Sequence, residues 1–553
     1  MILFPPIRLK SNWHANCTYT SESYREVGMR KTKLMIALIG AIIIPLTLFS
    51  GVLPVPKSHR IMAIITTEDL APAADSFKLW HNALGETTYV YTTNYIYSSY
   101  FGRDKQEKIR VFIQYLNQAE GINTIMILGD TLKVPIRQAM YSGQYNDARI
   151  PTDLYYGDLD GNWDANGNGI FGEYINGINV DNVDGMPDVV IGRIPLSNNE
   201  ALIDYFHKMV KYETTVPTLS AHFWGSSIYD PDDGIGQNYC LRLKSGLPSG
   251  IATKTLFNPM VDTFGAYPRW VGDGELSKTN AIKDLSSGNF ITVHIDNGGL
   301  NWFGTGYIVN GERLFDYNLK GIETRFYIST SSYGAMSVKG SIGYAFLVGG
   351  GLAYIGNTSI GNPEEAIGYE RLLNNLFSDS TAYLGEAFTR VFGDNLYFNY
   401  TMNYMGDPLL RVYPVTPSVL NYSIKYGTSK ITINTGVSGV YVSLIRGDSI
   451  VCDGFTDEDG TITLPYYREG SYKAVLSKKG YVVSVVNLMR YNGIKDNYEQ
   501  DEKSDVKLDL TRARVYSISG RYLGKYADLR TSLAGGVYIV SDGRVTRKIS
   551  LIK

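Results

Sequence analysis

Cysteine is scarce in this chain: three of its 553 residues are cysteines. Cys17 precedes the apolar segment described below, and Cys240 and Cys452 lie far apart in the sequence, so we expect no disulfide framework. Cys240, in a Gln-Asn-Tyr-Cys-Leu run, is typical of a small buried apolar residue more than of a nucleophile. A chain without disulfides must therefore be held together by core burial or by bound metal ions.

An excess of charge of one sign is also lacking. The chain has 52 Lys and Arg against 54 Asp and Glu, a net charge of −2. Without a basic cluster this balance excludes a nucleic-acid partner. Its 44% hydrophobic and 19% charged residues are ordinary for folded protein, and the length allows about three or four domains.

Long apolar runs are absent except for one, from Leu34 to Phe49. It is shorter than the roughly 20 residues that span a bilayer, and Pro45 interrupts it. A basic start at residues 29–33 and the small residues Ser50 and Gly51 after it predict a signal peptide over 29–51, with a transmembrane anchor as the less favoured alternative. We expect residues 1–28 to be a mis-called translation start.

Alternating strand and helix patterns dominate residues 59–413 and predict a mostly parallel α/β sheet. In the first half, 59–215, strands are expected at 61–65 and 124–128 with a helix at 104–118. A capping box at Ser197–Glu200 predicts a helix that buries Leu202, Phe206 and Val210. In the second half, 216–413, strands are expected at 289–294, 326–329 and 351–355, with a helix at 341–347.

The pattern changes after residue 414. Residues 415–490 have short alternating runs with turn signals such as Asp459-Gly460, which predict a β-sandwich. Residues 491–511 are charged and predict a linker, and 512–553 predict a small all-β tail domain.

The segment Phe326-Tyr-Ile-Ser-Thr-Ser331-Ser-Tyr-Gly334-Ala-Met336 predicts a strand, a turn at Gly334 and a helix of small and apolar residues. Such a turn can present a reactive side chain at the carboxyl edge of a sheet. Serine at that position is a poor nucleophile unless a base activates it.

A second strand end carries the only histidine near this pattern, in Ile291-Thr-Val-His294-Ile-Asp296-Asn297-Gly298-Gly299. His294 can serve as a general base if it reaches the nucleophile. It can equally be a histidine that backbone hydrogen bonds satisfy beside a turn, and its position in the sequence favours neither role.

An acidic, glycine-rich run extends from Asp158 to Glu173. Oxygen donors on alternate residues, with glycines that permit tight turns, suit calcium. The candidate ligands are Asp158, Asp160, Asn162, Asp164, Asn166, Asn168 and Glu173, and Asp181, Asp184 or Asp188 can complete the site. Glu173 comes two positions before the twelfth-position ligand of an EF-hand, so we expect a structural calcium site of loop type; the alternative is a polar turn cluster without metal.

Several segments in 59–413 resemble the gingipain family of cysteine peptidases, in the family's order. They are Ile127–Asp130, Pro151–Asp158, Pro187–Pro195, Gly356–Thr358 and Met405–Leu409. The resemblance implies a caspase-like α/β unit in two subdomains, 59–215 and 216–413, followed by an immunoglobulin-like domain. It also implies secreted, cysteine-type cleavage of polypeptides by a histidine in a Gly-His-Gly turn and a cysteine in Cys-x-x-Gly.

This sequence departs from the family at both dyad positions. The cysteine motif falls on Ser331–Gly334, and the histidine motif falls on Asp296-Asn297-Gly298, with His294 three residues earlier. Gly298 and Gly334 stand at the turn or oxyanion positions. We therefore expect a degenerate dyad, with His294 beyond hydrogen-bond reach of Ser331 and Asn297 facing the nucleophile loop. The alternatives are an active peptidase, an inactive polypeptide-binding protein, and a structural surface protein.

The tail resembles the carboxyl-terminal sorting domain of type IX secretion. The matching residues are Val515–Arg521, Leu533–Val540, Gly543 and Lys548. This resemblance implies the type IX secretion machinery as a partner, and release from the cell or attachment to the outer-membrane surface.

Overall fold

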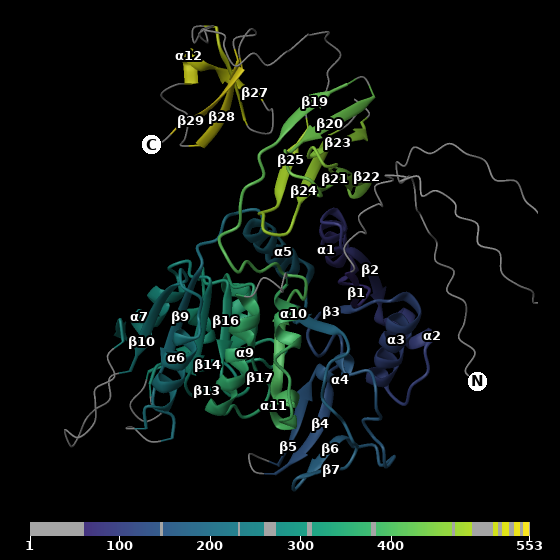
Figure 1. The fold of residues 1–553 in the computed structure, drawn as a ribbon, viewed down its shortest axis with the longest axis vertical. Helices are drawn as coiled ribbons and strands as arrows, with labels where there is room; N and C mark the ends of the chain where they lie inside the picture. Colours follow the sequence, from purple (N-terminus) through teal and green to yellow (C-terminus); the bar gives the residue numbers. More distant parts are fainter. Residues whose placement is uncertain are drawn as a thin grey trace, which may run out of the picture. The chain divides into compact units, whose positions relative to one another are not determined.

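The computed structural model describes two units, Met1–Arg490 and Tyr491–Lys553 (Figure 1). The described residues of the first are 60–143, 147–229, 233–258, 272–306, 312–377, 383–427, 429–466 and 471–488. Those of the second are 512–517, 522–529, 536–541 and 546–551. The expected start segment, signal peptide and linker, and Cys17, lie outside these ranges. Within them, no helix is both long and apolar enough to cross a membrane.

One sheet of 11 strands forms the centre of the first unit, in the order β11-β10-β9-β12-β16-β17-β18-β8-β3-β1-β2. Every residue of β3, β8, β12 and β16 is buried, which explains their near-continuous apolar runs. The bounds are β1 Ile61–Thr66, β2 Thr87–Thr92, β3 Thr124–Leu128, β8 Val190–Ile194, β9 Ser220–Gly225, β10 Ala252–Phe257, β11 Gly274–Glu275, β12 Ile291–Ile295, β16 Phe326–Ser329, β17 Ala353–Asn357 and β18 Met402–Gly406.

The two halves of the α/β region share this sheet. All its pairings are parallel except β17 with β18, and β18, from the second half, pairs with β8 of the first through Met405 and Arg193. Arg193 is buried beside this junction, where its Nε and Nη2 each lie 2.7 Å from a carboxylate oxygen of Asp153. Two parallel charge-assisted hydrogen bonds fix the arginine in place.

Helices flank the sheet, and their ends follow local capping rules. Asp104 caps α3 by accepting from the Glu107 amide at 2.8 Å, and Gly121 ends the helix with φ +66°. Helix α5 corrects the expected capping box, because Asn198 rather than Ser197 is its N-cap. Leu202 is buried as expected, but Phe206 and Val210 are not fully buried. The large side chains that α5 buries beside Leu202 are Tyr205, Met209 and Tyr212. The bounds are α1 Ala71–Ala83, α2 Thr93–Ser99, α3 Lys105–Glu120, α4 Leu154–Gly157, α5 Asn199–Glu213, α6 Ile235–Ser245, α7 Lys278–Leu285, α8 Ile342–Gly349, α9 Ala366–Leu376, α10 Leu384–Thr389 and α11 Leu396–Thr401.

Small sheets stand beside the large one. The first has the order β5-β4-β6-β7 and the second β13-β14-β15. Their strands are β4 Arg137–Ser142, β5 Asp147–Thr152, β6 Phe171–Ile175, β7 Ile178–Asn179, β13 Gly298–Gly299, β14 Trp302–Gly304 and β15 Arg313–Phe315, and the short helices η1 Asp316–Asn318 and η2 Pro363–Glu365 follow further along the chain.

Two antiparallel sheets follow the α/β region, in the orders β19-β20-β23 and β22-β21-β24-β25. Residues of both sheets, including Ile433 and Leu476, form one hydrophobic core. The bounds are β19 Ser423–Tyr426, β20 Lys430–Asn434, β21 Tyr441–Arg446, β22 Ser449–Phe455, β23 Thr461–Pro465, β24 Tyr472–Ser477 and β25 Ser484–Asn487. The region is tied to the large sheet's surroundings by Arg411 Nη2, which donates to Ser477 Oγ at 2.7 Å.

The second unit contains one sheet in the order β27-β26-β28-β29. Its elements are β26 Arg514–Ser517, β27 Tyr522–Lys525, α12 Tyr526–Leu529, β28 Gly536–Ser541 and β29 Thr546–Leu551. Val515 and Val540 are buried in it. Residues 518–521, residues 533–535 and Gly543 of the sorting motif lie outside the described residues.

A buried charge cluster holds the end of α1 against the loop after β18. His81 Nδ1 lies 2.7 Å from Glu86 Oε2, and its Nε2 lies 2.9 Å from Asp407 Oδ2. Burial alone lowers the pKa of His81, but the charges and hydrogen bonds of Asp407 and Glu86 outweigh it and raise the pKa from 6.5 to about 10. Between pH 6.5 and about 10, His81 is therefore protonated in the folded protein and neutral in the unfolded chain.

This proton makes stability depend on pH. With the folded pKa raised, the contribution of His81 is complete below pH 6.5 and is lost as pH rises to about 10. At pH 7 we expect His81→Gln to destabilise the protein by about 3 to 5 kcal/mol, because it removes the protonated imidazole that lies between the buried carboxylates of Glu86 and Asp407. The loss should shrink toward pH 10 in calorimetric melts, and His207→Gln, at an exposed position of α5, is the control. A loss that does not change with pH would contradict the assignment.

Candidate active site

The candidate site lies where β12 and β16 end side by side. These strands are parallel neighbours, and His294 is paired in register with Ser329. Ser331 follows two residues later, so its hydroxyl lies over the same edge of the sheet. Loops after β9, β12, β16 and β17 surround this point, as the carboxyl ends of strands do at the sites of open α/β sheets.

The structure corrects the expected separation of His294 from Ser331. His294 Nδ1 lies 3.2 Å from Ser331 Oγ and 2.8 Å from Ser329 Oγ. Ser329 Oγ also lies 2.8 Å from Ser331 Oγ. The sequence interpretation was wrong because it counted His294 as three residues short of the turn. Because β12 and β16 are parallel and in register, His294 lies next to the end of β16 although it is not part of the turn after β12.

The tautomer of His294 follows from its second contact. Its Nε2 lies 2.9 Å from the carbonyl oxygen of Gly304, which can only accept. Nε2 therefore carries the proton, and Nδ1 presents its lone pair to the hydroxyls of Ser329 and Ser331. This is the tautomer that a general base requires.

The basicity of His294 is nevertheless low. Its side chain is fully buried, and burial lowers the pKa of His294 to about 4, with only partial compensation from the Gly304 carbonyl. Asp296 Oδ2 lies 3.9 Å from Nε2, too far for a hydrogen bond. Burial raises the pKa of Asp296 to about 7, and this carboxylate accepts from the Gly306 amide at 2.8 Å instead. An imidazole with so low a pKa is a weak base near neutral pH.

Asn297 does not face the nucleophile loop as expected. Its Nδ2 donates to the carbonyl oxygen of Ile228 at 3.1 Å, in the loop after β9. The backbone carbonyl oxygen of Asn297 lies 3.5 Å from Ser331 Oγ. The side chain thus links two loops and has no part in the hydroxyl–imidazole network.

Access to Ser331 is closed. Ser331 and His294 are both 0% exposed. A Cβ added to Gly298 would lie 2.3 Å from Ser331 Oγ, so the backbone of β13 rests directly on this hydroxyl. Leu300, in the same hairpin, accepts from the Ile342 amide of α8 at 2.7 Å. No reacting carbonyl can approach Ser331 Oγ while the hairpin is in place.

The turn after β16 also differs from expectation. The residue with left-handed backbone is Tyr333, at φ +59°, and not Gly334. Gly334 is required instead by a close approach, since a Cβ there would lie 2.3 Å from the hydroxyl oxygen of Tyr354. Helix α8 begins at Ile342, after further turns, and Ser341 caps it.

Two groups in the hydrogen-bond network of His294 were not predicted from the sequence. Ser329 bonds the imidazole more closely than Ser331 does, and the carbonyl of Gly304 sets the tautomer. Ser329 could have been found, because it precedes Ser331 by two residues and strand side chains repeat with that period. Cys240 is buried as expected, with its Sγ 3.3 Å from the Trp224 carbonyl oxygen, and burial raises the pKa of this thiol well above its usual value.

The acidic run divides into two groups. In the first, Glu173 Oε2 accepts from the side-chain amides of Asn166 and Asn168, both at 2.7 Å. Asp164 Oδ2 accepts from the Gly169 amide at 3.1 Å and is paired with Arg103. Asn162 accepts from the Asp164 amide. The Asp181 carboxylate accepts from the backbone amides of Ala165 and Glu173, and it thereby connects the two ends of this loop.

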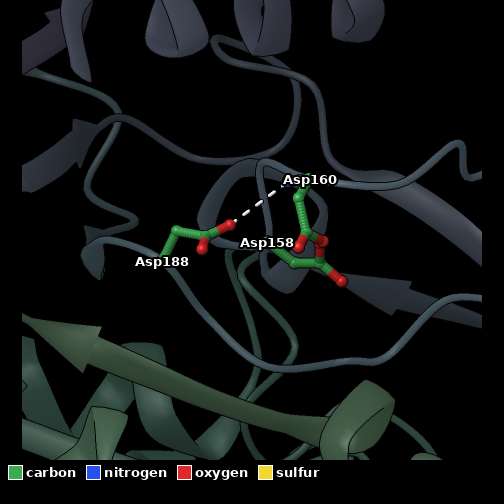
Figure 2. Close-up of side chains that lie close together, drawn as sticks. All are labelled: Asp158, Asp160 and Asp188. Carbon is green, nitrogen blue, oxygen red and sulfur yellow. Dashed lines mark hydrogen bonds between the residues drawn. The ribbon is translucent and has the colours of Figure 1, made fainter. Parts of the chain in front are cut away.

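The second group is Asp158, Asp160 and Asp188, shown in Figure 2. One carboxylate oxygen of each lies within 4.8 Å of those of the other two. Burial raises the pKa of Asp158 to about 8, and the charges of Asp184 and Asp160 add to this increase while Arg110 opposes it. Asp188, outside the acidic run itself, thus joins its first two members.

The family model described as peptidase family C25 matches residues 56–413. Among solved structures, the Arg-specific cysteine proteinase gingipain R (RgpB) matches with 15% identity over 79% of this chain and 99% of that chain, at a TM-score of 0.55. The complex of Porphyromonas gingivalis RgpB pro- and mature domains matches with 15% identity, 77% and 99% coverage, and a TM-score of 0.56. No curated protein sequence matches this chain. The structural likeness establishes a gingipain-like α/β fold.

The close contact between the β13–β14 hairpin and Ser331 can be tested by substitutions that change the space between them. Gly298→Ala should lower stability by about 1 to 3 kcal/mol, because its Cβ has no room beside Ser331. Adding Ser331→Gly removes both clashing atoms and should recover part of the loss, measured as a coupling free energy in urea unfolding.

Gly246→Ala is the control, since the nearest atom to its added Cβ is 3.6 Å away. Independent, additive effects of Gly298→Ala and Ser331→Gly would show that the two residues do not touch.

Proposed function

Since the match over residues 56–413 places this chain in peptidase family C25, we propose that it is a surface or secreted member that binds extended polypeptide without cleaving it. The family supports a polypeptide as the ligand. The observation that carries the proposal is the burial of Ser331 beneath Gly298. A nucleophile that no substrate reaches, next to a base of low pKa, supports a degenerate dyad.

A cavity near the loops around the closed serine is the surface that we propose for binding. A cavity of about 390 Å³ is lined by residues of the loop after β9, of α6 and of η2, among them Tyr229, Tyr239 and Pro363. The loop after β9 is the one that Asn297 holds through Ile228. The loop before η2 contacts the nucleophile loop through Gly361, whose amide donates to Ser332 Oγ at 3.0 Å.

Exposed aromatic side chains lie at this edge. Tyr229 is 64% exposed and Tyr333 is 37% exposed. Aromatic rings with polar tips supply much of the binding energy at polypeptide interfaces. These exposed rings support the proposal that polypeptide binds at this edge although the dyad is closed.

A second candidate is serine-type hydrolysis by Ser331 with His294 as base. The 3.2 Å contact and the tautomer with a free Nδ1 favour it. It requires the β13–β14 hairpin to lift from Ser331.

The two functions give opposite results with labelled casein as the probe. We expect the full chain to bind casein without cutting it, and Tyr229→Ser combined with Tyr333→Ser to weaken binding by about tenfold or more in fluorescence anisotropy. The matched control is Tyr317→Ser with Tyr422→Ser, at exposed positions away from the cavity. Cleavage of casein that disappears in both Ser331→Ala and His294→Gln would establish the hydrolase and refute the proposal.

We also propose export by the signal peptide at 29–51 and the type IX machinery, on the sequence of the tail. The separate four-stranded sheet of residues within 512–551 supports a folded sorting domain. A reporter placed between residues 29–51 and 491–553 should reach the outer surface of a bacterium with type IX secretion and remain periplasmic when that system is deleted. Surface delivery of a fusion without residues 512–553 would contradict this proposal.

A further inference from the structure

One buried carboxylate holds both ends of the β13–β14 hairpin that covers Ser331. Asp296 comes directly after β12 and is 2% exposed. Its Oδ1 accepts from the amide of Asn297 at 2.6 Å, and its Oδ2 accepts from the amide of Gly306 at 2.8 Å. Because the hairpin lies between these two residues, the chain leaves the carboxylate of Asp296 and then returns to it.

Hydrogen bonds between neutral groups hold the hairpin elsewhere. At its tip, the carbonyl oxygen of Leu300 accepts from the amide of Ile342 at 2.7 Å. Near its base, the carbonyl oxygen of Thr305 accepts from Asn258 Nδ2, also at 2.7 Å. These two bonds do not depend on pH, whereas the bonds to the carboxylate of Asp296 do.

The charges around Asp296 do not compensate its own. Among the residues that the structure describes, the ionisable groups that interact with it are His294 on β12, Tyr327 on β16, Cys240 on α6 and Asp233 in the loop after β9. His294 is neutral above about pH 4 and donates to the carbonyl oxygen of Gly304 in the hairpin. Asp233 adds a negative charge. A buried carboxylate without a positive partner is costly to keep ionised.

The proton of Asp296 therefore links the hairpin to pH. Burial raises the pKa of Asp296 to about 7, and hydrogen bonds from Ser226, Asn297 and Gly306 offset only part of this increase. Lifting the hairpin would break the bond from Gly306 and admit water, which returns the pKa toward 3.8. Since the closed form has the higher pKa, its stability relative to the open form is complete below pH 3.8 and is lost as the pH rises to about 7.

We propose that the β13–β14 hairpin is a pH-dependent cover over Ser331, and that the carboxylate of Asp296 makes this cover open more readily as the pH rises toward neutrality. The observation that carries the proposal is a buried carboxylate that bonds both ends of the hairpin and has no positive partner among the described groups. The inference deepens the proposed function and rests on it, because it names what regulates access to the closed serine.

The test follows hydrogen exchange of amides 298–306 in the full chain, with each rate divided by the intrinsic exchange rate at the same pH. In the wild type this corrected rate should rise about tenfold for each pH unit between pH 5 and 7 and should rise no further above pH 7. Asp296→Asn keeps the size of the side chain but does not titrate, so its corrected rate should be the same at every pH. Exchange in β3 reports global unfolding and should remain slower than exchange in the hairpin.

Asp316→Asn is the matched control. Asp316 directly follows β15 of the same small sheet, and its carboxylate accepts from the Tyr317 amide at 2.9 Å instead of bonding the ends of the hairpin. This variant should keep the tenfold rise for each pH unit. The proposal fails if the wild-type hairpin shows no rise, if Asp296→Asn keeps the rise, or if the hairpin exchanges only as fast as β3.

A second measurement asks whether the opening reaches the serine. Labelling of Ser331→Cys by a small thiol reagent, relative to labelling of Tyr317→Cys at an exposed position, should follow the same pH dependence and should lose it when Asp296→Asn is added. Cys240 and Cys452 are buried, and labelling of the wild type gives their background. Casein is absent from both measurements, so their failure would overturn the cover and leave the binding proposal standing. Casein that is neither bound nor cut would refute the proposed function alone.

Discussion

The parallel register between β12 and β16 is the constraint on which the site depends. It sets His294 opposite Ser329 and carries Ser331 over the same sheet edge. Because side chains alternate along a strand, a slip of one residue would send the imidazole to the other face of the sheet. The Gly304 carbonyl then holds the ring, and the glycine backbone of β13 closes over the serine. Each later feature presupposes that pairing.

Proximity of a base to a hydroxyl is not sufficient for catalysis. A reacting carbon needs a position about 3 Å from the nucleophile, with donors nearby for the developing charge. Here the Gly298 backbone occupies that position. The hydroxyls of Ser329 and Ser331, the imidazole and the Gly304 carbonyl satisfy one another instead, and a fully satisfied buried polar network rigidifies its surroundings. The same atoms that resemble a dyad thus act as structural elements in this conformation.

Features set by local physics could be predicted from the sequence, whereas features set by long-range pairing could not. The buried strands β1 and β3 and the apolar face of α3 follow from composition and spacing, and the gingipain resemblance was confirmed. The distance from His294 to Ser331 depends on strand register, which the spacing of motifs along the chain does not reveal. The division of the acidic run was hidden for a similar reason: Asp160 is four residues from Asp164, yet its spatial partner is Asp188. The Asn198 cap shows that even a local rule can be misplaced by one residue when two adjacent polar residues compete for the position.

Hydrogen bonds connect the segment of residues 158–188 to the candidate site through α11. Asn399 Nδ2 donates to the carbonyl oxygen of Gly185, in that segment, at 3.2 Å. Two residues earlier, the Tyr397 hydroxyl donates to the Ile360 carbonyl oxygen at 2.7 Å, in the loop after β17. That loop accepts the Tyr333 amide through Ser359 at 2.8 Å. Hydrogen bonds, and not disulfides, thus connect the loop of Ser331 to a segment that lies far away in the sequence. Rigid support at this distance serves a binding surface as well as it serves an enzyme, because both need side chains that are positioned before the ligand arrives.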